Sequence, residues 1–341
     1  MPQFVKFCIA FCIFIIALSY LNARFVTTDA QYLEQVKFKE AFHPTIKAPI
    51  IILGDSRGES SLNPVFFDDF PGGAYNFCFQ GAQIRFVKDF YEKAIKPYYP
   101  KPRIIVYQVF PDMFMRDGRK FEQMSEYFPV SLFVKELIQS PERKMAFYNR
   151  FSLYKNRSNL WIKYHGNYDD SVHKFNFYKG WIPIYGFINI TAHSELKMLE
   201  HEFYASIDDA KIEPQSEKML DEMISNWIKD GIKVVFIQIP TLIIKKVNHK
   251  IALSKQESVL SSIAKKYNLI YLNYNSNLSS FNNQIYFYHD SKHLNLPGSI
   301  FFNMDLHKAF FQHRLNEFSK DKIRIGDYEC EIGEFIQLHL K

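Results

Sequence analysis

The chain of 341 residues lacks several features that would place it in a function class at once. It has no block of lysine and arginine and no basic helix stripe, and its net charge of +6 is spread along the sequence. A nucleic-acid partner is therefore not expected, because such proteins concentrate their basic residues on one face. No internal repeat is visible, and a hydrophobic content of 47% indicates a substantial core rather than a disordered chain.

Cysteine is scarce as well, with four residues in the whole chain. Cys8 and Cys12 lie in an apolar run near the N-terminus, which leaves Cys78 and Cys330 as the one pair available to the rest of the protein. We expect both to be free and structural, and a disulfide between them is the less favoured alternative.

The apolar run covers residues 7–21, carries no charge and is bounded by Lys6 and Arg24, a pattern typical of an export signal or a membrane anchor. Its length falls between the ~20 residues of a full span and the ~7 to 15 of a cleavable signal. Because no clean pair of small residues follows it, we favour an uncleaved anchor over residues 1–26, with the domain outside the cytoplasm. Residues 27–48 are interpreted as a stalk with a possible short helix.

Apolar runs and helical periodicities alternate through the rest of the chain. The runs predict strands over residues 50–53, 74–79, 103–110, 232–239 and 269–273. The periodic segments predict helices over residues 82–96, 214–230, 252–267 and about 297–315. Because strands separated by helices pair in parallel, the sequence predicts an α/β fold with a five-stranded parallel sheet and helices on both faces.

The alternation of predicted strands and helices is interrupted at about residues 112–209. This segment is rich in aromatic residues and shows neither a helical nor an alternating hydrophobic period. The series comprises Tyr148, Phe151, Tyr154, Trp161, Tyr164, Tyr168, Phe175, Phe177, Tyr178, Trp181 and Tyr185. We interpret the segment as an irregular insertion or cap with short helices. A small satellite core is the favoured explanation for the rings, and a platform for stacking sugars is the alternative.

Two short polar motifs flank the predicted sheet. Gly54, Asp55 and Ser56 follow the first strand, where a glycine allows a sharp turn that presents the serine at the sheet edge. Asp290 precedes His293 by three residues just ahead of the last helix, so that one turn can bring the carboxylate to the imidazole. Each motif alone is common in turns without a function. The combination of the two motifs indicates a catalytic site.

His289 is a second histidine in the same stretch. Because His289 is adjacent to Asp290 in sequence and cannot easily face it, the spacing favours His293 as the base. A metal site built from these residues is the less favoured interpretation, since no further ligand cluster appears. We therefore expect neither a metal nor a cofactor.

Together the two motifs resemble those of the SGNH/GDSL hydrolase superfamily, over roughly residues 49–315 and excluding the aromatic insertion. The resemblance implies a flavodoxin-like three-layer α/β/α sandwich, in a domain that we place over residues 49–341. It also implies that Ser56 is the nucleophile, His293 the general base and Asp290 its orienter.

The same resemblance implies an oxyanion hole formed by the backbone N–H groups of Ser56 and Gly81. The family's third block, Gly-x-Asn-Asp, normally adds an asparagine amide. Here residues 108–112 have no asparagine, and Gln108 is the candidate replacement. Loss of one such donor costs about 100-fold or more in rate, so this departure bears on activity.

The motifs and the apolar run together resemble the membrane-anchored SGNH-like proteins of bacterial cell-surface polysaccharide acylation, such as alginate acetyltransferases and the D-alanine-transfer protein of teichoic acid modification. That resemblance implies an enzyme anchored in the cytoplasmic membrane, a surface glycan as acceptor and a polytopic membrane O-acyltransferase as partner. The acyl group, acetyl by preference, would be transferred to sugar or removed by water through an acyl-Ser56 intermediate. A catalytically silent scaffold or glycan-binding subunit is one alternative, and a lipase-like esterase is another.

Overall fold

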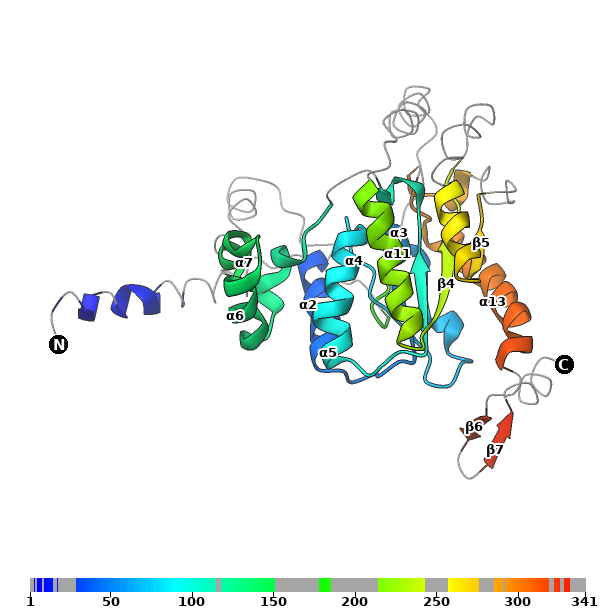
Figure 1. The fold of residues 1–341 in the computed structure, drawn as a ribbon, viewed down its shortest axis with the longest axis horizontal. Helices are drawn as coiled ribbons and strands as arrows, with labels where there is room; N and C mark the ends of the chain where they lie inside the picture. The colour runs from blue at the N-terminus through cyan, green and yellow to red at the C-terminus, as the bar shows by residue number, and fades with distance from the viewer. Residues whose placement is uncertain are drawn as a thin grey trace, which may run out of the picture.

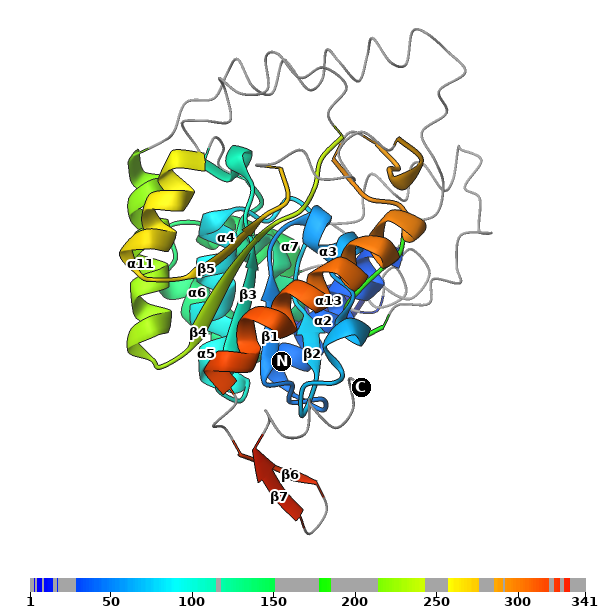
Figure 2. The same cartoon turned by 90° about the vertical axis from the view of Figure 1, so that its right-hand side faces the viewer.

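A parallel β-sheet forms the centre of the computed structural model. The structure describes residues 29–114, 118–150, 178–184, 214–242, 257–275, 285–290, 292–318, 322–325 and 328–331, together with residues 3, 5–7, 9–14 and 17. The strands are β1 (Ile50–Leu53), β2 (Ala74–Asn76), β3 (Ile104–Gln108), β4 (Lys233–Gln238) and β5 (Ile270–Asn273). They pair in parallel in the order β2-β1-β3-β4-β5, at the centre of the fold in Figure 1 and with all five strands labelled in Figure 2. The predicted five-stranded parallel sheet is confirmed.

The strand order changes direction at β1, which lies between β2 and β3. This is the flavodoxin-like order, and such a switch point places the ligand crevice at the carboxyl ends of the strands on either side of it. Every residue of β1 and β3 is buried, as expected for strands that are covered on both faces. The end of β1 therefore leads directly to the edge where chemistry is expected.

Helices cover both faces of the sheet and make the predicted three-layer α/β sandwich. Ile51 and Leu53 of β1 pack with α2 (Asp29–Phe42), α4 (Ile84–Phe90) and α11 (Pro214–Lys229). Ile50 and Ile52 belong to a second core on the opposite face, beside α3 (Ser56–Ser61) and α13 (Leu296–Phe318). Figure 2 shows α13 crossing one face of the sheet, with α4 and α11 on the other side.

Helix α2 is where the structure differs from the stalk expected over residues 27–48. Phe38 and Ala41 are fully buried, and the Phe38 ring lies 5.3 Å from the ring centres of both Phe79 and Phe90. The buried face of α2 also carries Lys37. A charged residue on the buried face removes the apolar period by which such a helix is recognised in a sequence.

The helix predicted over residues 82–96 is present and extends beyond its predicted end. It consists of α4, a π-helical turn η2 (Tyr91–Ile95) and a short α5 (Lys96–Tyr98). Pro97 lies inside α5, directly after the π turn. A π turn widens the helix where the proline ring would otherwise meet the carbonyl of the preceding turn.

The described parts of the insertion expected at residues 112–209 are short helices. They are η3 (Pro111–Phe114), η4 (Phe121–Tyr127), α6 (Val130–Gln139) and α7 (Arg143–Arg150). Residues 178–184 follow and begin with a tight turn that a bridge between Tyr178 and Trp181 closes. Of the aromatic series, Trp181 is buried, and Tyr148 and Tyr178 are exposed. The remaining rings of that series lie outside the described residues.

Smaller elements complete the fold. They are η1 (Pro64–Phe67), η6 (Ile285–Phe287) and an antiparallel hairpin of β6 (Lys322–Ile325) and β7 (Tyr328–Glu331). Cys78 is a buried free thiol. Among the described residues no helix is both long and apolar enough to cross a membrane, and most of the expected anchor over residues 1–26 lies outside them.

Candidate active site

The turn after β1 presents Ser56 as the first residue of α3. Asp55 is the N-cap of this helix, and its Oδ1 accepts the N–H of Arg57 at 2.9 Å. Its Oδ2 lies 3.4 Å from Nε of Arg57, so the two side chains also form an ion pair across the turn. The Ser56 N–H takes no part in the helix, because the first N–H groups of a helix have no carbonyl to bind. Asp55 and Arg57 thus support the turn and leave Ser56 half-buried at the sheet edge.

Gln108, at the end of β3, holds the other side of the turn. Its side chain is fully buried, and its Oε1 accepts the N–H of Asp55 at 2.9 Å. A Cβ atom on Gly54 would come within 2.4 Å of this Oε1 and 2.7 Å of the Gln108 Cβ, so the close approach requires glycine. Gln108 is therefore a support of the nucleophile turn. The role of its amide as an oxyanion donor stays a prediction.

Gln108→Met is expected to lower the free energy of unfolding by about 1–3 kcal/mol, because the buried N–H of Asp55 would lose its acceptor. Gln238→Met is the matched control, since Gln238 is equally buried at the end of β4 and accepts the hydroxyl of Tyr271 at 2.6 Å. Both variants should be less stable in chemical denaturation. Only Gln108→Met should also slow the reaction of Ser56 with an activated ester, and equal losses of this reaction would contradict the role assigned to Gln108.

The second motif lies in a loop that is closed by a bridge between Tyr288 and Leu294. Oδ1 of Asp290 accepts the N–H groups of Lys292 at 2.7 Å and His293 at 2.8 Å. Oδ2 of the same carboxylate lies 2.7 Å from Nδ1 of His293. The backbone of the loop thus positions the Asp290 carboxylate, and the carboxylate in turn positions the His293 imidazole.

His293 Nε2 lies 2.8 Å from the Ser56 hydroxyl. The structure therefore brings Ser56, His293 and Asp290 into one hydrogen-bonded chain, as the two motifs predict. His289 lies outside this chain: its side chain is exposed, and its N–H donates to the carbonyl of His293. A serine, an imidazole and a carboxylate in this sequence form the arrangement that activates a hydroxyl nucleophile.

Asp290 is held in its charged form. Burial opposes the charge, but the hydrogen bond and attraction from His293, together with two backbone N–H groups, lower the pKa of Asp290 to about 2. The carboxylate then accepts the proton on Nδ1 of His293, which leaves Nε2 free to accept the proton of Ser56. The network thus selects the tautomer in which the ring is a base toward serine.

Asp290 is not expected to titrate between about pH 4 and neutrality, so loss of its charge should not contribute to the pH–activity profile in that window. A carboxyl with a lowered pKa stabilises the fold above its usual pKa of about 3.9, and this contribution is lost only as the pH falls towards 2. Asp290 therefore stays charged across that window. Measurement of kcat/KM against pH tests this, and a slope of two within the window would show that Asp290 titrates there.

The predicted oxyanion loop lies beside the nucleophile turn. The N–H of Phe79 donates to the carbonyl of Gly54 at 3.1 Å, which extends the pairing with β1 beyond β2. Gly81 follows in an exposed turn with φ of +68°, a conformation that favours glycine, and its carbonyl accepts the N–H of Arg119 at 3.1 Å. The role of the Gly81 N–H as an oxyanion donor stays a prediction.

Solved structures resemble this fold. The chain is similar to a putative acylhydrolase from Bacteroides fragilis (11% identity, TM-score 0.38, covering 77% of this chain and 86% of that chain). It is also similar to a GDSL-like lipase from Bacteroides thetaiotaomicron (10% identity, TM-score 0.39, covering 84% of this chain and 98% of that chain). A third similar structure is a catalytic mutant of an acetylxylan esterase from Geobacillus stearothermophilus (13% identity, TM-score 0.37, covering 77% of this chain and 92% of that chain). No protein-family model and no curated protein sequence matches the chain.

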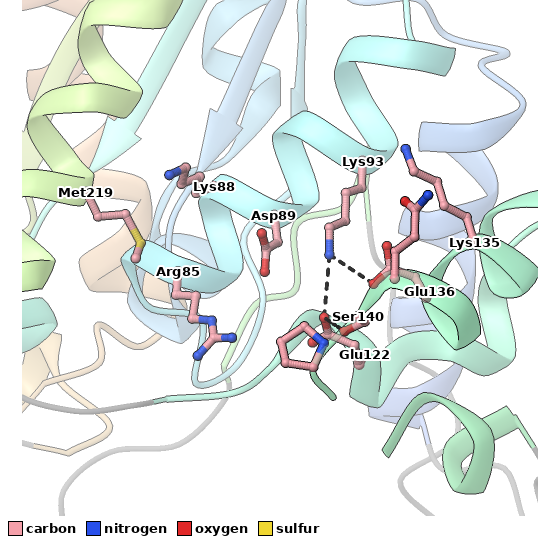
Figure 3. Close-up of a pocket in the computed structure, with 11 residues that line it drawn as sticks. Arg85, Lys88, Asp89, Lys93, Glu122, Lys135, Glu136, Ser140 and Met219 are labelled. Atoms are coloured by element: carbon pink, nitrogen blue, oxygen red, sulfur yellow. Dashed lines mark hydrogen bonds and ion pairs between the residues drawn. The ribbon is translucent and has the colours of Figure 1, made fainter. Parts of the chain in front are cut away.

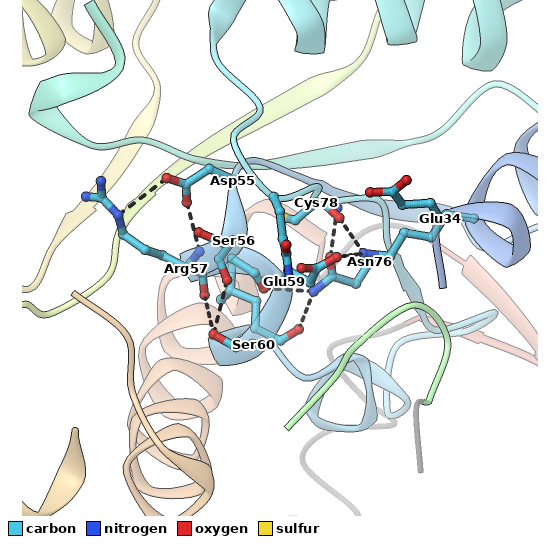
Figure 4. A network of polar contacts seen from close by, with 12 residues as sticks. Glu34, Asp55, Ser56, Arg57, Glu59, Ser60, Asn76 and Cys78 are labelled. Carbon is cyan, nitrogen blue, oxygen red and sulfur yellow. Dashed lines mark hydrogen bonds and ion pairs between the residues drawn. The ribbon is translucent and has the colours of Figure 1, made fainter. Parts of the chain in front are cut away.

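A buried polar network lies behind the nucleophile and was not anticipated from the sequence (Figure 4). Lys37 of α2 is fully buried, and its Nζ lies 2.8 Å from Oε1 of Glu59 and also donates to the carbonyl of Cys78. Burial raises the pKa of Glu59, against the attraction of Lys37. Nδ2 of Asn76 donates to the carbonyls of Gly58 and Leu62, each at 2.8 Å. These contacts join α3 to α2 and to the loop after β2.

Residues 178–184, which we call the strap, cross the carboxyl end of α3. Nε1 of Trp181 donates to the carbonyl of Ser60 at 2.7 Å, and the N–H of Ile182 donates to that of Glu59 at 3.2 Å. At its far end, the Ile184 carbonyl accepts the N–H of Leu296, the first residue of α13. The strap therefore links the helix that carries the nucleophile to the helix that follows the histidine loop.

A charged hollow of about 310 Å³ lies away from the triad, between α4 and α6 (Figure 3). Its central cation, Lys93, lies 3.4 Å from a carboxylate oxygen of Glu122 and 3.0 Å from one of Glu136. No triad residue lines this hollow. Over the part of the chain that the structure describes, no group of three histidine, cysteine or acidic residues is placed to hold a metal.

Proposed function

We propose that this protein is a serine acyl-transfer enzyme that works through an acyl-Ser56 intermediate. One observation carries the proposal: the Ser56 hydroxyl lies 2.8 Å from Nε2 of His293, whose Nδ1 lies 2.7 Å from the Asp290 carboxylate. A nucleophile and a base within hydrogen-bond reach, with a third group that orients the base, form the signature of covalent acyl transfer.

The first half-reaction forms the acyl-enzyme. His293 takes the Ser56 proton as the hydroxyl oxygen attacks an ester carbonyl, and the Asp290 carboxylate stabilises the resulting imidazolium. The N–H groups of Ser56 and Gly81 are the proposed donors to the oxyanion. When the tetrahedral intermediate collapses, the bond to the leaving alcohol breaks and His293 gives that alcohol its proton.

The second half-reaction repeats this chemistry with an acceptor hydroxyl. His293 removes the proton of the acceptor, the acceptor oxygen attacks the acyl carbon, and Ser56 leaves with the proton. Water as the acceptor makes the protein an esterase, and a sugar hydroxyl makes it a transferase.

We infer a bacterial cell-surface polysaccharide as the acceptor or donor of the acyl group, with acetyl preferred. The proposal includes residues 1–26 as a membrane anchor, a catalytic domain outside the cytoplasm and a polytopic membrane O-acyltransferase that supplies the acyl group. Its support is the combination of the two catalytic motifs with the apolar run over residues 7–21.

Trapping the intermediate tests the proposal. The full-length chain is incubated with p-nitrophenyl acetate, quenched in acid and analysed by intact and peptide mass spectrometry. One acetyl group is expected on the Ser56 peptide, and Ser56→Ala should abolish it because the attacking oxygen is gone. Ser131→Ala, which removes an exposed hydroxyl from α6, is the matched control and should label normally.

The outcomes separate the competing functions. Equal labelling of Ser56→Ala would overturn the proposal. Glycan binding without an acetyl-enzyme or turnover would favour the silent scaffold, and faster turnover of long-chain than of short-chain esters would favour the lipase-like esterase. Release of the acetyl group that accelerates with a deacetylated surface polysaccharide, and not with buffer alone, would identify a transferase.

A further inference from the structure

Helices α6 and α7 expose large apolar side chains at the surface of the sandwich. On α6, Val130, Val134 and Ile138 follow one another at intervals of four residues and are 68%, 46% and 71% exposed. This spacing forms a single stripe along the helix. On α7, Phe147 and Tyr148 are each 47% exposed. We call these five residues, with Lys135, Arg143 and Lys144, the docking residues.

The exposed charges of the two helices are all basic, namely Lys135, Arg143 and Lys144. Two carboxylates nearby are in ion pairs. Glu136 is buried and lies 3.0 Å from Lys93, which it shares with Glu122, and Glu142 lies 2.5 Å from Lys120. Figure 3 shows Lys93 between the two glutamates of the hollow. The docking residues therefore combine aliphatic and aromatic side chains with exposed positive charge, a combination that suits the interface of an anionic lipid bilayer.

The two helices lie next to α2, the helix that follows the apolar run. The Phe38 ring centre of α2 lies 5.4 Å from that of Tyr127, at the end of η4. The Ser125 hydroxyl of η4 donates to the carbonyl of Ala146 in α7 at 2.6 Å. Figure 1 shows α6 and α7 at one end of the sandwich, on the side of α2.

The connection from the apolar run to α2 is short. Residues 22–28 separate the run over residues 7–21 from Asp29, and a fully extended chain of that length spans at most about 25 Å. A bilayer that holds the run therefore keeps α2, and the neighbouring α6 and α7, close to its surface.

We propose that α6 and α7 dock on the surface of an anionic lipid bilayer through the docking residues. This inference rests on the membrane anchor of the proposed function and goes beyond it, because an anchor alone leaves the domain free to rotate. The aliphatic stripe enters the headgroup region, and the three basic side chains contact lipid phosphates. Docking then fixes the direction in which the catalytic edge of the sheet faces.

A fluorophore attached to a single cysteine tests the docking in the full-length chain. The background is Cys8→Ala, Cys12→Ala and Cys330→Ala, in which the remaining Cys78 is fully buried and its thiol pKa is raised by that burial. Ile138→Cys places the label on α6. Lys218→Cys places it on α11, where the native side chain is 79% exposed.

The labelled chains are inserted into vesicles of phosphatidylcholine, with or without phosphatidylglycerol, that contain brominated lipid. Quenching is expected at position 138 in the anionic vesicles, and at position 218 in neither. Arg143→Glu with Lys144→Glu should lower the docked fraction more than about ten-fold, because each basic residue near an anionic surface contributes roughly five-fold in affinity. Lys218→Glu with Lys229→Glu, which makes the same charge change on α11, should leave it unchanged.

Equal quenching at the two positions in chains that float with the vesicles would overturn the docking and leave the anchor standing. Quenching at position 138 that rises with protein density in neutral vesicles would indicate self-association and also overturn it. Chains that float with neither vesicle would contradict the anchor, and the docking with it. Acetylation of Ser56 is scored separately, so a failure of the chemistry is distinguishable from each of these results.

Discussion

His293→Ala is expected to lower kcat/KM for p-nitrophenyl acetate by about ten-thousand-fold or more, because Ser56 would lose the base that takes its proton. The imidazole is the middle group of the three hydrogen-bonded side chains. Its Nε2 lies 2.8 Å from the Ser56 oxygen, and its Nδ1 lies 2.7 Å from the Asp290 carboxylate. Adding Asp290→Asn should cause little further loss, since residues that act as one unit are not additive. Initial rates over a range of ester concentrations give the comparison.

His289→Ala is the matched control for this experiment. It removes an exposed imidazole from the same loop, and it leaves the backbone hydrogen bond between residues 289 and 293 in place. Activity within about two-fold of the parent chain is expected, because surface substitutions away from special features change little. A large loss in His289→Ala with a small loss in His293→Ala would contradict the assignment of the base.

Lys37→Met is expected to lower the free energy of unfolding by about 3–5 kcal/mol, because it leaves Glu59 buried without its cation. Both side chains of this pair are almost completely buried, with exposures of 0% and 6%. The variant would also lose the contact with the Cys78 carbonyl, which precedes the predicted oxyanion loop. Chemical denaturation gives the stability, and kcat gives the effect on the site.

A double-mutant cycle separates the ion pair from simple packing. Lys37→Met combined with Glu59→Met should be more stable than the two single effects predict, since neither charge is then left alone. Strict additivity would contradict the pair. Lys218→Met, on the exposed face of α11, controls for loss of a lysine and should change stability by less than about 0.5 kcal/mol.

The pH dependence of Lys37→Met provides a second measure. Burial raises the pKa of Glu59 even beside Lys37, and without that lysine the shift should grow. A carboxyl whose pKa is higher in the folded than in the unfolded state favours folding while it is protonated, and this contribution is lost as the pH rises. The stability deficit of the variant should therefore be smallest at acid pH and largest near neutrality.

The strands and the triad were predictable because their signals are local. Ile50–Leu53 is a continuous apolar run, and Gly54 and Ser56 follow it directly. Asp290 and His293 are three residues apart and lie on one turn. What joins the two motifs is the parallel topology, which places the ends of neighbouring strands at one edge.

The supports of the site were not predictable, because their partners are distant in sequence. Lys37 and Glu59 are 22 positions apart, and Trp181 lies 121 positions from Ser60, whose carbonyl it binds. A lysine on a predicted helix is interpreted as a solvated residue until its buried partner is known. The sequence predicts an oxyanion donor in the Gln108 amide N–H group, whereas in the structure the side-chain oxygen of Gln108 accepts the N–H of Asp55.

The 237 positions between Ser56 and His293 have a consequence for biogenesis. A ribosome delivers the chain in order, so the serine is made long before the loop that supplies its base. During that interval Ser56 has no partner to remove its proton, and the nascent chain is inert toward esters. If the chain crosses a membrane unfolded, the site assembles only after the last helix of the sandwich has followed. The order of synthesis thus delays the pairing of Ser56 with His293 until most of the sandwich has been made.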